Sequence, residues 1–122
     1  MQKFWGYHLM LDCSNCNKNY IKDIKNIEDF INAVITATKM KKLGDLKVEN
    51  LQSGDRALFG YSVVQIIHTS SITCHFIEMS GDCYIDVFSC KKFDPTIISS
   101  IVQSYFEPEN INKHYLIRDA KI

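Results

Sequence analysis

The sequence predicts an α+β fold, a two-layer α/β sandwich in which a mostly antiparallel sheet is backed by two helices on one face. Several stretches alternate apolar and polar residues with a period of two, which is typical of strands. Two other stretches place apolar residues at three- and four-residue steps, which is typical of amphipathic helices. With 122 residues, 46% of them hydrophobic, the chain is expected to form a single domain, residues 1–122.

The first half predicts one strand, one helix and two further strands. The segment "KFWGYHLMLDC" alternates along its length, and the polar "NCNKNY" then interrupts it. Between Asp23 and Met40, isoleucine and valine recur at helical spacing, and Gly44 is expected to end this helix. "LKVENLQ" and "YSVVQIIH" are strands in this interpretation, with "SGDRALFG" as the loop between them.

The second half repeats the pattern as two strands, one helix and one strand. "SITCHFIEM" and "DCYIDVFSC" are predicted strands joined by a hairpin turn around Ser80 and Gly81. Asp94 is placed to cap a helix that has Pro95 at its first position, and Pro108 is expected to stop that helix. "KHYLIRDA" follows as a final short strand.

Charge and hydropathy disfavour two classes of partner. The 14 lysines and arginines balance the 14 aspartates and glutamates, so the chain has no basic field for nucleic acid. It contains no apolar run long enough to span a bilayer, and the N-terminal residues do not follow the signal-peptide pattern. We therefore expect a cytoplasmic protein with no nucleic-acid or membrane partner. The five cysteines are expected to remain reduced thiols.

The cysteines differ in what their surroundings suggest. Cys13 and Cys16 form a CxxC pair, but no second pair exists to complete a four-ligand zinc site, so no metal is expected. Cys74 and Cys83 lie in apolar strands and are interpreted as small buried residues. Cys90 ends a strand just before two lysines and a helix start, where a thiol is either a partly exposed acid or nucleophile, or inert.

The stretch "HTSSITCH", residues 68–75, is unusually rich in hydroxyl groups and has a histidine at each end. Alternation places His75 on the same face as Ser71 and Thr73. A half-exposed strand with a hydrogen-bonded histidine explains this composition, and so does a reactive site. The residues alone leave both interpretations open.

Nearly the whole chain resembles the small prokaryotic S-adenosylmethionine decarboxylase proenzymes, which cleave themselves at a serine and depend on the resulting pyruvoyl group. The segment Gly6–Leu9 matches the Gly-x-His-Leu strand that opens these proteins. Without a gap, Ser70 takes the place of the cleaved serine, and His75 that of the processing histidine. The segment "DVFSC" then matches the family's Asp-x-Phe-Thr-Cys signature, with Cys90 on the catalytic cysteine, and "FDP" follows at the helix start.

The resemblance implies a self-processing reaction. Ser70 would attack the carbonyl of Thr69, converting the amide to an ester, and cleavage would give a β chain, 1–69, and an α chain, 70–122. His75 would accept the α-proton of Ser70 during processing. Ser62, which falls on a serine that assists processing in the family, would stabilise the oxyanion.

The resemblance also implies how a substrate would react. The pyruvoyl group derived from Ser70 would form a Schiff base with the amine of S-adenosylmethionine, and Cys90 would return a proton after carbon dioxide leaves. No external cofactor and no metal would be needed. The family resemblance further suggests a homodimer of processed α/β pairs, with active sites near the subunit interface, working in spermidine and polyamine biosynthesis.

Three departures from the family pattern concern processing and the substrate pocket. Thr69 replaces the usual glutamate, and Ser71 stands where a histidine is common. The family's Thr-Trp-Pro-Glu, which helps hold the nucleoside, is replaced by residues 76–79. Phe76 or Ile77 is expected to stack on adenine and Glu78 to accept from a ribose hydroxyl. The alternatives are a pyruvoyl-dependent ornithine or arginine decarboxylase and an unprocessed, non-catalytic homologue.

Overall fold

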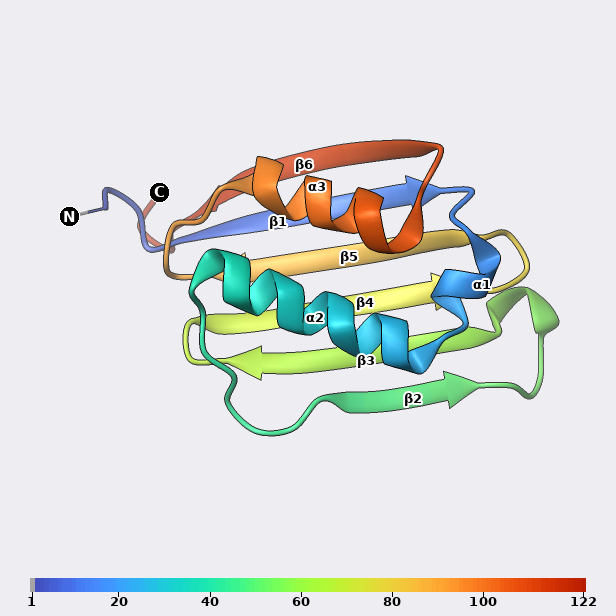
Figure 1. The fold of residues 1–122 in the computed structure, drawn as a ribbon. Helices are drawn as coiled ribbons and strands as arrows, with labels where there is room; N and C mark the ends of the chain where they lie inside the picture. Colours follow the sequence, from blue (N-terminus) through green and yellow to red (C-terminus); the bar gives the residue numbers. More distant parts are fainter. Residues whose placement is uncertain (1) are drawn as a thin grey trace.

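The computed structural model describes residues 2–122 and has one antiparallel sheet with two long helices on one of its faces (Figure 1). The strand order is β2-β3-β4-β5-β1-β6, and every neighbouring pair is antiparallel. The strands are β1 (Gly6–Ser14), β2 (Lys47–Leu51), β3 (Gly60–Ile67), β4 (Ser70–Ile77), β5 (Asp82–Ser89) and β6 (Asn110–Arg118). The helices are α1 (Lys18–Ile21), α2 (Ile24–Thr38), the 3-10 turn η1 (Arg56–Leu58) and α3 (Pro95–Phe106). The predicted two-layer α+β architecture is confirmed.

Helix α2 begins where the sequence indicates and ends earlier than predicted. The Asp23 side chain accepts hydrogen bonds from the backbone N–H groups of Lys25 and Asn26, which caps the helix. Gly44 does not end it: Lys39 adopts the left-handed conformation, with φ of 58°, directly after Thr38. Its N–H donates to the last helical carbonyls, so a lysine supplies the closing turn that usually falls to glycine.

Helix α3 confirms the predicted signals, whereas β6 is longer than predicted. Asp94 caps α3 and Pro95 is its first residue, and the helix ends before a left-handed Glu107 and Pro108. Strand β6 begins at Asn110 and pairs with β1 along its full length. Because β6 lies at the sheet edge and is mostly exposed, its first residues carry no apolar alternation that would reveal them.

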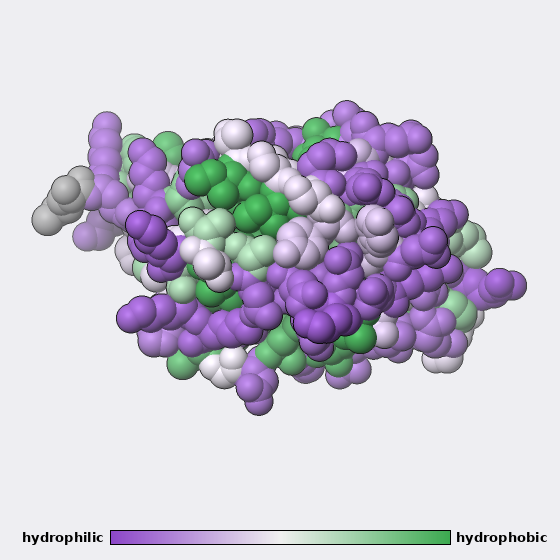
Figure 2. Space-filling view, in the orientation of Figure 1, coloured by the Kyte–Doolittle hydropathy of each residue, from purple (hydrophilic) through white to green (hydrophobic). Residues whose placement is uncertain are grey.

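The core lies between the sheet and the two long helices. Alternate residues of the inner strands point toward the helices, where Phe106 of α3 packs against Phe30 and Phe76 with ring centroids 4.8 and 5.0 Å apart. Figure 2 shows that the outer side of the helix layer is mostly hydrophilic, with an apolar area over α3 and other apolar atoms along the lower edge of the view. Within the described part of the chain, no helix is both long and apolar enough to cross a membrane.

The two ends of the sheet carry different connections. The β3–β4 turn, the end of β5 and both chain termini lie at one end, on the left in Figure 1. The β4–β5 hairpin and α1 lie at the opposite end. Because β4 runs from the first end to the second, residues at its start and finish are separated by the length of the strand.

Candidate active site

Ser70 begins β4 in an unusual backbone conformation. It follows a two-residue turn, His68 and Thr69, and pairs with Ile67 on β3. Two-residue hairpin turns normally place positive φ on the turn residues, but here neither has it, and Ser70 instead has φ of 150°. This region is occupied almost only by glycine and costs about 1–3 kcal/mol for other residues. Backbone strain is therefore concentrated on the residue that follows the Thr69–Ser70 bond.

The carbonyl group of Thr69 is held by a backbone donor. The N–H of Cys90 donates to this oxygen at 2.8 Å, and the hydroxyl of the buried Ser89 donates to Thr69 Oγ1, also at 2.8 Å. An N–H group aimed at a carbonyl oxygen stabilises negative charge that develops there when a nucleophile attacks. Thr69, Ser70, Ser89 and Cys90 are called the cleavage cluster below.

Gly6 allows β1 to pass close to the cleavage cluster. A Cβ atom at Gly6 would lie 3.1 Å from the carbonyl oxygen of Ser89, which is tighter than most side-chain contacts, and in ordinary contact with Cα of Cys90 at 3.5 Å. The close approach of the two backbones therefore explains why the opening Gly-x-His-Leu segment has a glycine at this position. It brings the residue before it, Trp5, to the same end of the sheet as Cys90.

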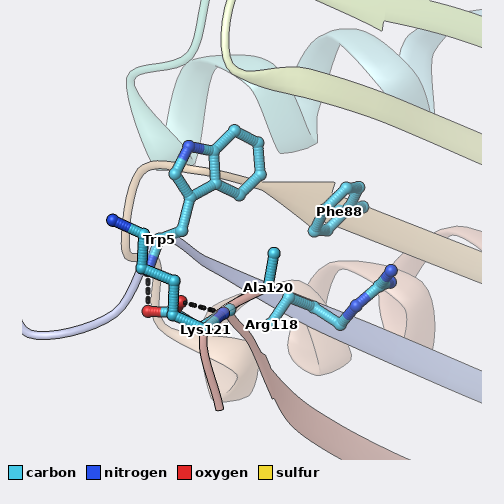
Figure 3. Close-up of a pocket in the computed structure, with 6 residues that line it drawn as sticks. Trp5, Phe88, Arg118, Ala120 and Lys121 are labelled. Carbon is cyan, nitrogen blue, oxygen red and sulfur yellow. Dashed lines mark hydrogen bonds between the residues drawn. The ribbon is translucent and has the colours of Figure 1, made fainter.

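A pocket of about 480 Å³ adjoins this end of the sheet, within the size range of small-molecule sites. Figure 3 shows the indole of Trp5 and the ring of Phe88 along the same side of the pocket, and their centroids lie 5.8 Å apart. Trp5 is the only tryptophan in the chain, and it is 57% exposed. The lining residues are Trp5, Phe88, Arg118, Asp119, Ala120 and Lys121.

A series of polar contacts, from Arg118 through His8 to Asp86, lies beside the ring of Phe88. The guanidinium of Arg118 lies 4.7 Å from the Phe88 centroid and donates to His8 Nδ1 at 3.4 Å. Because arginine only donates, Nδ1 must accept, so the proton sits on Nε2, which donates to Asp86 at 3.1 Å. The histidine of the opening segment thus fixes Asp86 and Phe88, the first and third residues of "DVFSC".

Ser62 and His75 face each other on β3 and β4, with Ser62 Oγ 2.8 Å from His75 Nδ1. We call this pair the dyad. His75 lies five residues after Ser70 along one strand, a distance of about 17 Å at 3.3 Å per residue. The structure therefore does not bring the dyad to the cleavage cluster within one chain. The donor on the Thr69 carbonyl is the N–H of Cys90, and Ser62 does not take the place expected for it.

The expected nucleoside residues are divided between the core and a second hollow. Phe76 is 1% exposed and packs against Phe106, so the expectation that it stacks on adenine is wrong. Ile77 is half-buried at the end of β4. Both carboxylate oxygens of Glu78 accept from the Gln52 amide, at 3.1 and 3.2 Å. Glu78 lines a hollow of about 290 Å³ that is separate from the Trp5 pocket and also includes Lys18, Lys22, Arg56, Phe59 and Met79.

Comparisons with known proteins agree with this architecture. The family described as S-adenosylmethionine decarboxylase matches residues 7–119. The chain belongs to the S-adenosylmethionine decarboxylase family. An S-adenosylmethionine decarboxylase proenzyme of Thermodesulfovibrio yellowstonii is 28% identical over 103 residues, covering 84% of this chain and 72% of that protein. One from Clostridium botulinum is 30% identical over 94 residues, 76% of each chain.

The fold is also that of a solved member of this family. The crystal structure of the adenosylmethionine decarboxylase from Aquifex aeolicus superposes with a TM-score of 0.80 at 19% identity. The match covers 97% of this chain and 93% of that structure. The six-stranded sheet with its helix layer is therefore the fold shared with that decarboxylase.

Sequence reasoning missed the Trp5 pocket. Trp5 is the chain's only tryptophan and precedes Gly6 directly, a signal that its place in an alternating strand pattern obscured. Arg118 offered no such signal, because only the β1–β6 pairing brings it opposite Gly6. Among residues 2–122, no group of three or more histidines, cysteines, aspartates or glutamates is arranged to hold a metal ion. All five cysteines are free thiols.

Proposed function

We propose that this chain is a proenzyme that cleaves itself between Thr69 and Ser70 and then decarboxylates S-adenosylmethionine with the pyruvoyl group so formed. One observation carries the proposal: the strained backbone of Ser70 coincides with a hydrogen bond from Cys90 N–H to the carbonyl that Ser70 would attack. Ground-state strain favours rearrangement of this bond, and the N–H stabilises the charge that develops.

The proposed cleavage needs only groups of the protein and water. Ser70 Oγ attacks the carbonyl carbon of Thr69, the C–N bond breaks, and the chain continues through an ester while residue 70 gains a free amine. A base then removes the α-proton of residue 70, and elimination releases the Thr69 carboxylate. Hydrolysis of the resulting dehydroalanine releases ammonia and leaves pyruvoyl at position 70. The β chain, 1–69, and the α chain, 70–122, stay paired through the sheet.

The surroundings of position 70 fit a pyruvoyl group. Residue 70 lies opposite Ser89 on β5, and the half-buried Cys90 directly follows Ser89. The Cys90 thiol therefore belongs to the residue next to the pairing partner of position 70, where the pyruvoyl group would form. When present, the pyruvoyl carbonyl acts as an electron sink for the amino group of a substrate. We assign to the Cys90 thiol the delivery of a proton to the substrate carbon that has lost carbon dioxide.

The distance between the dyad and the cleavage cluster leads us to propose a homodimer with shared active sites. The open sheet face that carries His75 also exposes large apolar side chains, with Ile66 45%, Tyr84 44% and Leu116 50% exposed. Apolar side chains gathered on one face of a small protein favour association. In a two-fold dimer, the cleavage cluster of one subunit receives Ser62 and His75 of the partner subunit.

We assign the nucleoside of the substrate to the Trp5 pocket. An exposed indole beside a second aromatic ring offers a stacking surface for a purine and an electron-rich face for a sulfonium cation. Ornithine and arginine have no large planar ring that would use this surface. The family match and the pocket together favour S-adenosylmethionine over these simple amino acids.

The thiols support a cytoplasmic location. All five cysteines are free, and four of them, Cys13, Cys16, Cys74 and Cys83, are buried. Free thiols persist in a reducing compartment. We therefore assign the proenzyme and its product chains to the cytoplasm.

The test is to purify the protein, measure its intact mass, and assay release of labelled carbon dioxide from carboxyl-labelled S-adenosylmethionine. We expect two fragments that meet at residues 69 and 70, with release from S-adenosylmethionine far above release from labelled ornithine or arginine. Two fragments with release only from ornithine or arginine would overturn the substrate assignment. A chain that stays intact after long incubation would overturn self-cleavage and indicate a non-catalytic homologue.

A further inference from the structure

Three buried cysteines meet at the end of the sheet opposite the cleavage cluster. Cys13, near the end of β1, pairs in register with Cys83 at the start of β5. Cys16 lies in the loop after β1, and its Sγ is 3.7 Å from Cys83 Sγ. The three side chains are at most 4% exposed. The proposed cleavage and decarboxylation use none of these thiols.

The loop that carries Cys16 is already attached to the β4–β5 hairpin. The N–H of Cys16 donates to the Gly81 carbonyl at 2.7 Å, and the N–H of Asn15 donates to Asp82 Oδ1 at 3.2 Å. A disulfide requires a sulfur separation of about 2.0 Å, so the two sulfurs must approach by about 1.7 Å. Cys16 lies outside any helix or strand, whereas Cys83 belongs to β5, so we assign the movement to the Cys16 side chain and its loop.

The two thiols differ in acidity. A hydrogen bond from the Cys83 thiol lowers the pKa of Cys16, against the opposing effect of burial. Hydrogen bonds to Cys13 and Cys16, together with burial, raise the pKa of Cys83. Cys16 is therefore the thiol that ionises first and attacks, because the thiolate is the nucleophile in disulfide exchange.

We propose that Cys16 and Cys83 are a modification site that forms a reversible disulfide when the protein meets an oxidising small-molecule disulfide such as oxidised glutathione. Because Cys16 is buried, the loop after β1 must first open locally; the Cys16 thiolate then attacks one glutathione sulfur and releases the first glutathione thiol. Cys83 then loses its proton, attacks Cys16 Sγ and releases the second thiol. Two electrons and two protons pass from the two cysteines to the glutathione disulfide, which is reduced to two thiols.

This disulfide has a distinctive consequence in a cleaved protein, and that consequence rests on the proposed function. Cys16 belongs to residues 1–69 and Cys83 to residues 70–122, so the bond joins the two product chains covalently. It also fixes the β4–β5 hairpin, which connects the strand of His75 to β5. Oxidation would thus fasten the product chains together at the end of the sheet where the dyad lies.

The test separates disulfide formation from self-cleavage by using the uncleaved Ser70→Ala chain. After exposure to oxidised glutathione, trypsin digestion without reductant should link peptide 4–18, which contains Cys16, to peptide 57–91, which contains Cys83. Fragmentation of the linked peptide identifies which cysteines are joined. Treatment with dithiothreitol should reverse the link completely.

Matched variants make the assignment specific. The link should be lost in Cys16→Ala and in Cys83→Ala. It should persist in Cys13→Ala, and also in Cys74→Ala, which removes a buried thiol that is not one of the three cysteines described above. Circular dichroism checks that the variants remain folded. A link within peptide 4–18, between Cys13 and Cys16, would overturn the proposal, and so would five free thiols in the oxidised, folded chain. In wild-type protein, a gel without reductant should show one band where the reduced gel shows two.

Discussion

The two ends of the β3–β4 pair place reactive groups by different means. At the turn end, main-chain groups dominate: Ser70 has a strained φ, and the Cys90 N–H holds the Thr69 carbonyl. At the other end, the side chains of Ser62 and His75 make one hydrogen bond on an open sheet face, in unstrained strands. In the proposed reaction, bond rearrangement therefore relies on the backbone, and proton transfer relies on side chains that a second subunit can approach.

The backbone strain at Ser70 can supply only a small part of the free energy that cleavage needs. A residue in a glycine-only region costs about 1–3 kcal/mol, which corresponds to roughly a 5- to 150-fold factor in an equilibrium or rate if it is released in the transition state. This is far less than a peptide bond needs in order to break. In the proposed reaction, the nucleophile, the oxyanion donor and a base must supply the remainder, and we assign the base to the dyad although it lies about 17 Å away.

The largest expected effect is at Ser70 itself. Replacing Ser70 with alanine removes the nucleophile, so the chain should remain a single species of uncleaved mass with no decarboxylase activity. Ser71→Ala is the matched control, since Ser71 is the adjacent hydroxyl on the same strand, and it should still cleave. Intact mass spectrometry measures both. An intact Ser71→Ala chain together with a cleaved Ser70→Ala chain would move the cleavage site by one residue.

The next prediction tests whether the two ends cooperate across a dimer. Ser70→Ala and His75→Ala chains, each inactive alone, are coexpressed with different tags. If His75 of the partner subunit serves Ser70, the mixed dimer has one complete site, and only the His75→Ala chain in it should be cleaved. If both residues acted within one chain, neither variant would be cleaved in any mixture. Mass spectrometry of the doubly purified dimer distinguishes the two results.

The sequence predicted the fold well because its inner elements carry regular patterns. Strands β1, β3, β4 and β5 alternate buried and less buried residues, and α3 has both an Asp94 cap and Pro95. The helix end at Lys39 was not predictable, because a lysine in the left-handed conformation leaves no mark in the sequence. The start of β6 was missed since its exposure removes the alternation.

The sequence nominated a set of candidate site residues, whereas their arrangement depends on strand pairing. Motif positions nominated Ser70, Cys90 and His75, and a spacing of five residues along a predicted strand already separates Ser70 from His75 by about 17 Å, but only the β3–β4 pairing shows that His75 faces Ser62 instead. The Trp5 pocket depends on the pairing of Gly6 with Arg118, a contact between the two termini. Phe76 followed from its position in the motif, and packing against Phe106 overrode that assignment.

Cys90 is proposed to contribute through its backbone N–H in cleavage and through its side-chain thiol in decarboxylation, and a substitution separates the two roles. Cys90→Ala keeps the backbone N–H on the Thr69 carbonyl, so cleavage should proceed at a similar rate. Turnover of S-adenosylmethionine by the cleaved variant should fall by about 10²–10⁴-fold, because a positioned acid is lost. Separate time courses of chain cleavage and of carbon dioxide release measure the two effects. Unchanged turnover would exclude the thiol as proton donor.

The Trp5 pocket should affect affinity with little effect on cleavage. Trp5→Ala removes the stacking surface and should weaken S-adenosylmethionine binding by about 1–3 kcal/mol, the usual range for stacking on an aromatic side chain. Trp5→Phe is the conservative control and should retain most of the affinity. The KM for S-adenosylmethionine measures the loss. Equal KM values for all three proteins would place the nucleoside elsewhere, with the hollow beside Glu78 as the next candidate.

The smallest expected effect tests the strain at the turn end directly. Glycine within a strand normally destabilises a protein relative to alanine by about 0.5–1 kcal/mol, but at φ of 150° only glycine is unstrained. Ser70→Gly should therefore be more stable to urea than Ser70→Ala by about 1 kcal/mol, with both chains uncleaved. At Ser71, whose φ is not positive, the order should reverse when both substitutions are made in the Ser70→Ala background. If alanine were the more stable residue at both positions, Ser70 would not be strained, and the cleavage cluster would then rely on its hydrogen bonds alone.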